Sequence, residues 1–469
     1  MIANNALEVV VLAAGKGTRM RSALPKVLHD LAGRTMLGHV LHTAAALQPQ
    51  AVHVVVGHGA DVVRERFGDT NVNWVVQEQQ LGTGHAVAQA LPAVAEAAHV
   101  LVLYGDVPLT PVTLLQQCFA AAQAGPALIT ARMPDPAQLG RIVRSAAGDV
   151  ERIVEYKDAS DAERAIDEIN SGILCASADF LRDHLNRLDS DNAQGEYYLT
   201  DVIGSAVADG LPVTAVVAEE PLDVAGVNDR VQLAELEREY QARAAVELMR
   251  GGATLRDPAR IDVRGTVRTG SDCLIDINAV FEGDVVLGND VTIGPNCVLV
   301  DAEIGSGTVV HANTVVEGAH IGERCSIGPF ARIRPGSEFA EGVKVGNFVE
   351  TKKSRLAAGA KANHLAYLGD ATIGESVNIG AGTITCNYDG INKHRTEIGD
   401  DVFVGTNATL VAPLSLGDGA FVAAGSTVTT RVGDGSLAVG RARQRNIDGW
   451  TRPDKRAPTD TDESSRNGS

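Results

Sequence analysis

The chain has 469 residues, of which 45% are hydrophobic and 4% aromatic, and it carries a formal net charge of −18. This length predicts two or three domains with folded cores. The negative charge argues against a general nucleic-acid or anionic-membrane surface, so neither nucleic acid nor a membrane is an expected partner.

Six cysteines are scattered along the chain without a C-x-x-C pair, so neither a disulfide framework nor a zinc site is indicated. The first apolar run, residues 8–12, lacks the basic flank and the cleavage site of a signal peptide. No apolar stretch approaches the roughly 20 residues that a membrane span needs. These features together predict a cytoplasmic location.

Residues 1–229 alternate strand and helix patterns. Strands are predicted at 9–12, 52–56 and 100–104, and helices at 36–47 and 86–97. This order predicts an α/β domain with a mostly parallel sheet that is covered by helices on both faces.

A glycine-rich loop, LAAGKGTRM over residues 12–20, follows the first strand directly. Its small residues let backbone amides approach a nucleotide, Arg19 adds a guanidinium for phosphate, and Lys26 adds a second cation. The loop lacks the third Gly of G-x-G-x-x-G and has no correctly spaced G-K-[ST], so neither the dinucleotide nor the Walker A motif fits. The loop alone leaves phosphate binding open.

Asp106 follows the strand predicted at 100–104. Ligands of open α/β sheets bind at the carboxyl ends of strands, where an acid can hold Mg²⁺ against substrate phosphates. The alternative is a structural role, in which Asp106 caps the helix that follows Pro108.

Residues 231–250 are predicted to form a long amphipathic helix. Its apolar stripe consists of Leu233, Leu236, Tyr240, Ala244 and Leu248. We expect this helix to connect two domains.

From Ile275 onward an apolar residue recurs at every sixth position, which fits neither helical period. Such a rhythm indicates a parallel β-helix of hexapeptide repeats, whose coils share one continuous core. The three unbroken runs are Ile275, Phe281, Leu287, Ile293 and Leu299; Val309, Val315, Ile321, Ile327, Ile333, Phe339 and Val345; and Ile398, Val404, Leu410, Leu416, Val422 and Val428.

The repeat is interrupted in two places. A basic, polar insert is predicted between Val345 and Ile373, and 19 residues separate Ile379 from Ile398 where 18 would keep the rhythm. Repeat proteins often place insertions on their binding face. His364 lies in the first interruption and could take the ammonium proton in acyl transfer to an amine. A lone histidine is more often structural, and a basic cluster alone is more often a solvated face.

Several of these segments resemble a known family. LAAGKGTRM, SALPK around Lys26, QEQQLGTGHA from Gln77 and YGDVPL from Tyr104 resemble sugar-nucleotide pyrophosphorylases. KVGNFVETKKSRL, AKANHLAYLGD and GAGTITCNYDGINKHRTEIGDDVFVG extend the likeness. Over residues 7–450, the chain resembles the bacterial bifunctional N-acetylglucosamine-1-phosphate uridylyltransferase and glucosamine-1-phosphate acetyltransferase family.

The resemblance implies three segments. They are a Rossmann-like nucleotidyltransferase domain (1–229), a linker helix (230–250) and an acetyltransferase domain (251–456) formed by a left-handed parallel β-helix. The polar tail, 457–469, lies beyond the likeness and is predicted to be disordered because it has little to bury. It also implies two reactions that make UDP-N-acetylglucosamine. Glucosamine 1-phosphate is acetylated by acetyl-CoA, and UTP then transfers its uridylyl group to the product with release of pyrophosphate.

By the same resemblance, the first site binds UTP, the sugar phosphate and Mg²⁺. Arg19 and Lys26 would contact the triphosphate as catalytic residues, and Asp106 and Asn228 would bind Mg²⁺. The remaining expected contacts to nucleotide and sugar are Leu12, Ala13, Ala14, Gly15, Gln77, Gly82, Thr83, Tyr104, Gly105, Gly140, Glu155 and Asn170. Without the resemblance, Asn170 and Asn228 would be taken as turn residues.

In the acetyltransferase half, the resemblance makes His364 the general base. Glucosamine 1-phosphate would be held by Arg334, Lys352, Tyr367, Asn378 and Lys393. Acetyl-CoA would contact Ala381, Asn387, Tyr388, Thr406, Ala424 and Arg441. Relatives often have Ser where this chain has Thr406. The family's β-helices associate as homotrimers, with this site between subunits.

Two other functions remain as alternatives. One is a single-activity sugar-1-phosphate nucleotidyltransferase whose β-helix serves only assembly, and the other is a scaffold protein without chemistry. The basic stretch around His364 speaks against the first, and Lys26, Asp106 and Asn228 speak against the second. A β-helical carbonic anhydrase would need a zinc-binding histidine cluster, which His311 and His320 alone do not provide.

Overall fold

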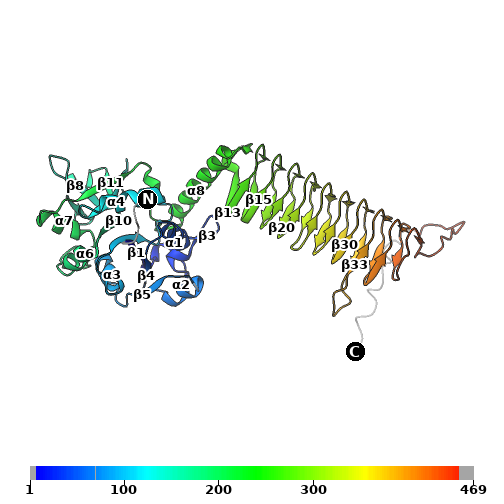
Figure 1. Cartoon of the computed structure of the whole chain (residues 1–469), viewed down its shortest axis with the longest axis horizontal. Helices are drawn as coiled ribbons and strands as arrows, with labels where there is room; N and C mark the ends of the chain where they lie inside the picture. The colour runs from blue at the N-terminus through cyan, green and yellow to red at the C-terminus, as the bar shows by residue number, and fades with distance from the viewer. Residues whose placement is uncertain (1–6, 69, 454–469) are drawn as a thin grey trace, which may run out of the picture.

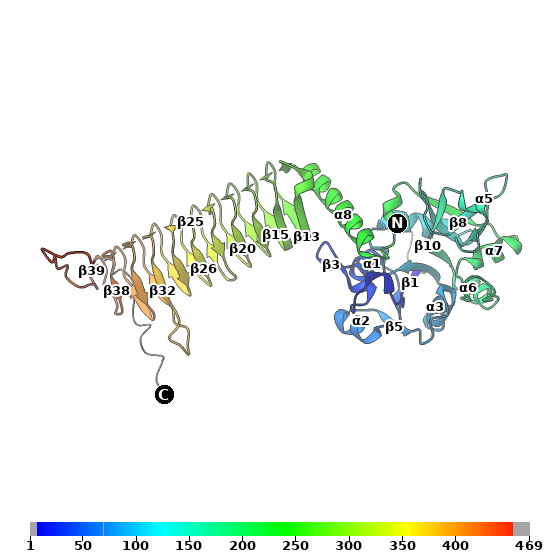
Figure 2. The same cartoon turned by 180° about the vertical axis from the view of Figure 1, so that it is seen from behind.

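The computed structural model describes residues 7–68 and 70–453. A rounded α/β domain is joined by helix α8 (Arg230–Arg250) to a long prism of stacked coils (Figures 1 and 2). The predicted fold class, with its connecting helix and left-handed β-helix, is confirmed. The predicted tail, 457–469, lies outside the described residues. Within the described ranges, no helix combines the length and the apolar character that a membrane span requires.

The first domain is built on a nine-stranded sheet in the order β11-β7-β10-β6-β1-β4-β5, in which β8 pairs with β10 and β9 pairs with β8. β1 pairs in parallel with β4 and β6, whereas β10 runs antiparallel to β6 and β7. The strands are β1 (Leu7–Ala13), β4 (Ala51–Val56), β5 (Asn73–Val76), β6 (His99–Tyr104), β7 (Ala127–Arg132), β8 (Arg141–Arg144), β9 (Val150–Val154), β10 (Glu168–Ser177) and β11 (Thr214–Ala218). A separate hairpin pairs β2 (Asp30–Leu31) with β3 (Arg34–Thr35).

Helices cover both faces of this sheet, as the sequence predicts. One face packs against α1 (Met36–Ala46), α2 (Ala60–Phe67) and α4 (Val112–Ala121). The other packs against α3 (Thr83–Ala90), α6 (Ala178–Leu185) and α7 (Asp201–Ala208). The helix expected at 86–97 starts earlier and gives way to a 3-10 turn, Leu91–Ala93, because Pro92 lacks the N–H that an α-helix needs. A short α5 (Asp161–Arg164) follows β9.

The prism has three ladders of parallel strands. The first ladder comprises β12 (Thr254–Leu255), β14 (Leu274–Ile275), β16 (Thr292–Ile293), β19 (Val309–Val310), β22 (Ser326–Ile327), β25 (Lys344–Asn347), β28 (Lys361–His364), β31 (Asn378–Ile379), β34 (Phe403–Val404), β37 (Phe421–Val422) and β39 (Leu437–Ala438). The second comprises β13 (Ile261–Thr269), β15 (Ala279–Leu287), β17 (Val298–Val300), β20 (Val315–Glu317), β23 (Arg332–Ile333), β26 (Glu350–Lys352), β29 (Tyr367–Gly369), β32 (Ile384–Cys386), β35 (Thr409–Val411) and β38 (Thr427–Val428). The third starts with the paired ends of β13 and β15 and continues with β18 (Glu303–Ile304), β21 (His320–Ile321), β24 (Glu338–Phe339), β27 (Arg355–Leu356), β30 (Ala371–Ile373), β33 (Thr396–Ile398) and β36 (Leu414–Leu416).

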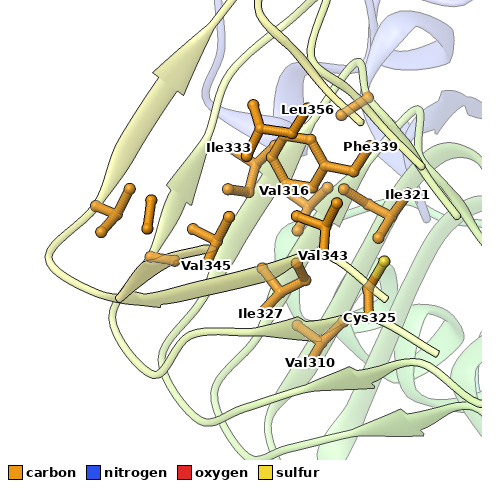
Figure 3. Close-up of a cluster of buried hydrophobic side chains, with 14 of the residues drawn as sticks. Val310, Val316, Ile321, Cys325, Ile327, Ile333, Phe339, Val343, Val345 and Leu356 are labelled. Carbon is orange, nitrogen blue, oxygen red and sulfur yellow. The ribbon is translucent and has the colours of Figure 1, made fainter. Parts of the chain in front are cut away.

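The first and third predicted hexapeptide runs point inward and are buried throughout. The second run is wrong at its start: the structure buries Val310 and Val316 completely and leaves Val309 and Val315 half-exposed. Figure 3 shows Val310 and Val316 inside the coil together with Ile327. The inward position shifts by one residue because successive coils pair at intervals of either eighteen or seventeen residues.

The basic stretch after Val345 is not an insert, contrary to the prediction. The coil continues through it with Thr351, Leu356, Ala362 and Leu368 as buried inward residues. The true insertion lies between β32 and β33, since Ile373 pairs with Ile398, 25 residues later. The extra residues form a loop, 387–395, that projects from the prism beside β33 (Figure 1).

Candidate active sites

The glycine-rich loop brings Lys26 to the carboxyl end of the sheet. Gly17 has a φ of 57°, and a Cβ added there would lie 2.6 Å from Cβ of Lys26, so only glycine fits this turn. Lys26 forms a largely buried ion pair with Asp106, directly after β6. Gly105 donates its N–H to the Leu12 carbonyl at 2.9 Å, which fixes the ends of β1 and β6 together.

A second cation and a second oxygen ligand lie beside this pair. Arg19 Nη2 donates to Asn228 Oδ1 at 2.8 Å. Asn228 is held near Asp106, because the N–H of its neighbour Val227 donates to the Asp106 carbonyl at 2.9 Å. The carboxylate and the amide oxygen are ligands that Mg²⁺ prefers, and the remaining positions of such an ion are filled by water and phosphate. The donor set therefore fits the expected metal.

Lys26 and Asp106 border a cleft of about 470 Å³ over the ends of β1 and β6, whereas Arg19 and Asn228 are not among the residues that line it. Ten predicted contacts line it: Leu12, Ala13, Ala14, Gly15, Lys26, Gln77, Gly82, Thr83, Tyr104 and Asp106. The cleft is also lined by Lys16, Val27, Gln80, Ala86 and Glu196, which the sequence analysis does not single out. Glu196 reaches the cleft because the segment around Tyr197 pairs with Leu81 and Gly84 through backbone hydrogen bonds.

The residues expected to contact the sugar lie beyond Tyr104. Asn170 donates its backbone N–H to the Gly140 carbonyl at 2.9 Å, and a Cβ on Gly140 would lie 3.4 Å from the Glu155 carboxylate. Burial raises the pKa of Glu155, although the Thr200 hydroxyl, 3.2 Å away, opposes the shift. Burial also raises the pKa of the Tyr104 phenol, and the charges of Glu155 and Asp106 add to this effect. Tyr104 thus lies between the sugar residues and the metal ligands.

In the second domain, one corner of the prism collects His364 and most of the expected CoA contacts. This corner, between the first and second ladders, stacks His364, Ala381, Thr406 and Ala424 on successive coils. Arg441 follows, with its Cδ near Gly425. The Asn347 Oδ1 atom lies 2.8 Å from Nδ1 of His364, one coil earlier. The column offers a basic ring nitrogen beside a row of small side chains.

The next corner, between the second and third ladders, collects cations. Arg334 forms an ion pair with Glu350 at 2.7 Å. The Lys393 ammonium lowers the pKa of Lys352, and the charge of Arg334 adds to this lowering. Tyr367 pairs with Glu350 across the second ladder. Three cations at one corner suit a phosphate group.

The inserted loop borders the same corner. Asn387 Nδ2 donates to Asp370 Oδ2 at 2.5 Å, and Tyr388 pairs with Lys393 across the loop. Asn378 lies apart from this cluster, because it belongs to the first ladder and faces outward beside Phe403.

Comparisons with known proteins cover both halves. Family models match as follows: a MobA-like NTP transferase domain at residues 9–249, the GMPPB C-terminal domain at 263–357, and a hexapeptide repeat of succinyl-transferase at 395–430. The bifunctional protein GlmU of Pseudomonas entomophila is 59% identical over 450 residues, which cover 96% of this chain and 99% of the relative. The GlmU of Stutzerimonas stutzeri is 59% identical over 453 residues (96% and 100%), and that of Alkalilimnicola ehrlichii 56% over 451 (96% and 97%). The chain belongs to the bifunctional GlmU family.

Two partners of the expected GlmU-type site residues, Asn347 and Glu350, lie in the segment KVGNFVETKKSRL but are not predicted as site residues. Asn347 precedes His364 by seventeen residues, and only the coil spacing reveals that the two are neighbours. Glu350 precedes Lys352 by two residues, and its pairing with Arg334 again depends on the stacking of coils. A correctly aligned repeat is the one signal that could have found them.

Proposed function

We propose that this chain is a two-site transferase that makes UDP-N-acetylglucosamine. Residues 1–229 carry uridylyl transfer, the helix at 230–250 links the domains, and residues 251–456 carry acetyl transfer. Membership of the GlmU family supports this assignment. The observation that carries it is the separation of two chemically distinct clusters, around Lys26 and Asp106 in the α/β domain and around His364 on the prism.

In acetyl transfer, the His364 ring acts as the general base. With its Nδ1–H donated to Asn347 Oδ1, the neutral ring keeps a lone pair on Nε2. Nε2 takes the proton from the amine of glucosamine 1-phosphate as the nitrogen attacks the thioester carbonyl of acetyl-CoA, and CoA leaves as the thiolate. Arg334, Lys352 and Lys393 bind the sugar phosphate with Tyr367 and Asn378. Ala381, Asn387, Tyr388, Thr406, Ala424 and Arg441 contact acetyl-CoA.

In uridylyl transfer, a phosphate oxygen of N-acetylglucosamine 1-phosphate attacks the α-phosphorus of UTP in line, and pyrophosphate leaves. Arg19 and Lys26 neutralise the triphosphate, Gln77 contacts uracil, and the group around Glu155 positions the sugar. Asp106 and Asn228 would hold Mg²⁺, which supplies charge neutralisation to the phosphates when bound.

We also propose that the β-helix assembles as a homotrimer. In three successive coils, the corner residue with a positive backbone φ is Phe330, Phe348 or Leu365. These side chains are 50%, 57% and 60% exposed. Earlier coils carry Asn at this position, the residue type that tolerates a positive φ. A second copy covering these apolar side chains beside His364 would explain them, and it could bring its own Asn378 to the site.

An assay with components omitted one at a time tests the function. The full mixture contains glucosamine 1-phosphate, acetyl-CoA, UTP and Mg²⁺, and free CoA and pyrophosphate are followed separately. Asp106→Ala is expected to lose pyrophosphate release and retain CoA release when glucosamine 1-phosphate is supplied. His364→Ala is expected to lose CoA release yet still use N-acetylglucosamine 1-phosphate and UTP. Loss of both reactions in either folded variant would contradict two separate sites.

A further inference from the structure

The side-chain amide of Gln77 is fixed by two acceptors. Gln77 follows β5 at the wall of the cleft, with a residue exposure of 3%. Its Nε2 atom lies 3.1 Å from the Gly82 carbonyl and 2.9 Å from Nδ1 of His85. An amide nitrogen has two hydrogens, so these acceptors use both of them.

The amide oxygen of Gln77 is left for a ligand. No group in the described part of the chain donates a hydrogen bond to Oε1, and this atom is not among the buried polar atoms without a partner. Because Gln77 lines the cleft, its Oε1 is a hydrogen-bond acceptor open to that cleft.

His85 can accept the hydrogen bond from Gln77 at Nδ1 in only one protonation state of its ring. It lies on α3, and its Nε2 is 3.3 Å from Nε2 of Gln89, one turn later. An amide nitrogen only donates, so the Gln89 amide must turn by 180° to present its oxygen to a proton on this ring nitrogen. A histidine Nδ1 accepts a hydrogen bond when the ring is neutral and its proton is on Nε2. The Gly82 carbonyl and Nδ1 of His85 therefore set which end of the Gln77 amide faces the cleft.

We propose that His85 is a positioning residue that makes the uridylyl site select uracil over cytosine. The proposal rests on the proposed uridylyl transfer. Uracil carries an N3–H donor, which Oε1 of Gln77 can accept, whereas N3 of cytosine is itself an acceptor and would face that oxygen. The Gln77 amide could accommodate cytosine only by rotating, and rotation would point Oε1 at two other acceptors, the Gly82 carbonyl and Nδ1 of His85.

A matched set of variants in the full-length protein tests this assignment. His85→Leu removes the acceptor, whereas the amide oxygen of His85→Asn can occupy the place of Nδ1. Pyrophosphate release is measured with N-acetylglucosamine 1-phosphate, Mg²⁺ and, in turn, UTP, CTP and dTTP. Thymine has the same N3–H as uracil, so dTTP controls for general damage to the cleft.

In His85→Leu we expect kcat/KM for UTP over CTP to fall about fivefold, the worth of one ordinary hydrogen bond. The ratio of UTP to dTTP should stay constant, and His85→Asn should keep the wild-type ratio of UTP to CTP. His85→Ala replaces the leucine variant if the latter does not fold. An unchanged UTP to CTP ratio, or an equal fall in both ratios, would overturn the role of His85. Absence of pyrophosphate release by the wild type with every nucleotide would instead overturn the uridylyl function itself.

Discussion

At the scale of single residues, Lys352 shows how neighbouring cations set a working pH range. Lys393 and Arg334 lower the pKa of its ammonium, so Lys352 loses its proton at a lower pH than an ordinary lysine does. Phosphate binding needs the charged form. We therefore predict that KM for glucosamine 1-phosphate rises with pH before the ordinary lysine pKa of about 10.4 is reached.

The substitution Lys393→Met tests two effects of Lys393, its contact with the substrate phosphate and its lowering of the pKa of Lys352. Removing Lys393 takes one contact from the phosphate, so KM should be higher at neutral pH. It also removes the main cause of the lowered pKa of Lys352, so the alkaline rise in KM should move to higher pH. A pH profile of KM for wild type and variant checks both, and a rise that stays at the same pH would show that Lys393 does not control Lys352.

Residues adjacent to a motif could be predicted from the sequence, and residues brought in by distant pairing could not. Gly15, Lys26 and Asp106 lie in or beside motifs at strand ends, and the structure places all three on one cleft. Glu196 lines the same cleft but depends on backbone pairing across more than one hundred residues. Asn347 depends on coil stacking. Local patterns specify a loop, whereas such contacts depend on the packed fold.

At the scale of elements, the hexapeptide rhythm predicts the β-helix but not every inward residue. Valine occupies both 309 and 310, and both 315 and 316, so spacing alone cannot tell the buried position from its neighbour. In the stretch taken for an insert, the inward positions hold Thr351 and Ala362, which are not large apolar residues. Thr351 is satisfied inside the coil by the Ser337 hydroxyl, 3.0 Å away.

The two adjacent valines give a direct test of the corrected alignment. Val310→Ala removes buried methyl groups and should lower the free energy of unfolding by about 2 kcal/mol. Val309→Ala, at the half-exposed neighbour, should cost less than half as much. Denaturant unfolding of both variants measures the difference, and equal losses would show that the coil alignment around β19 is different.

The exposed corner residues Phe330, Phe348 and Leu365, here called the corner column, support a second prediction for the β-helix. Phe348→Asn places at this left-handed corner the residue type found in Asn278, Asn296 and Asn313 of earlier coils. Backbone strain should fall, so the thermal midpoint of the isolated chain should not decrease. If the column is an interface, assembly should weaken and acetyl transfer should fall with it, whereas uridylyl transfer should persist.

Sedimentation velocity across a range of protein concentrations, combined with the two assays, checks this prediction. Val231→Asn, on the exposed side of α8, serves as a control for the loss of an exposed apolar side chain away from the prism. An unchanged oligomeric state in Phe348→Asn would remove the corner column from the proposed interface.

At the scale of the whole molecule, α8 joins the two domains through buried polar contacts. Gln241, 2% exposed, accepts from the N–H of Val263 at 2.7 Å and donates to its carbonyl at 2.9 Å. The same side chain donates to Glu237 at 2.8 Å, and Glu237 in turn accepts from the N–H of Ala32 at 2.7 Å. These hydrogen bonds connect the β2–β3 turn to β13, so helix and prism should behave as one rigid unit.

Gln241→Leu tests this junction without touching either site. The substitution leaves the buried N–H and C=O of Val263 without partners, at a cost of about 2 kcal/mol. Amide hydrogen exchange should therefore become faster across β13, whereas Glu247→Leu, on the exposed side of the same helix, should leave it unchanged. Both activities should persist, because each site is built from residues that lie away from this junction. Loss of one activity with unchanged exchange at β13 would show that Gln241 acts on that site by another route.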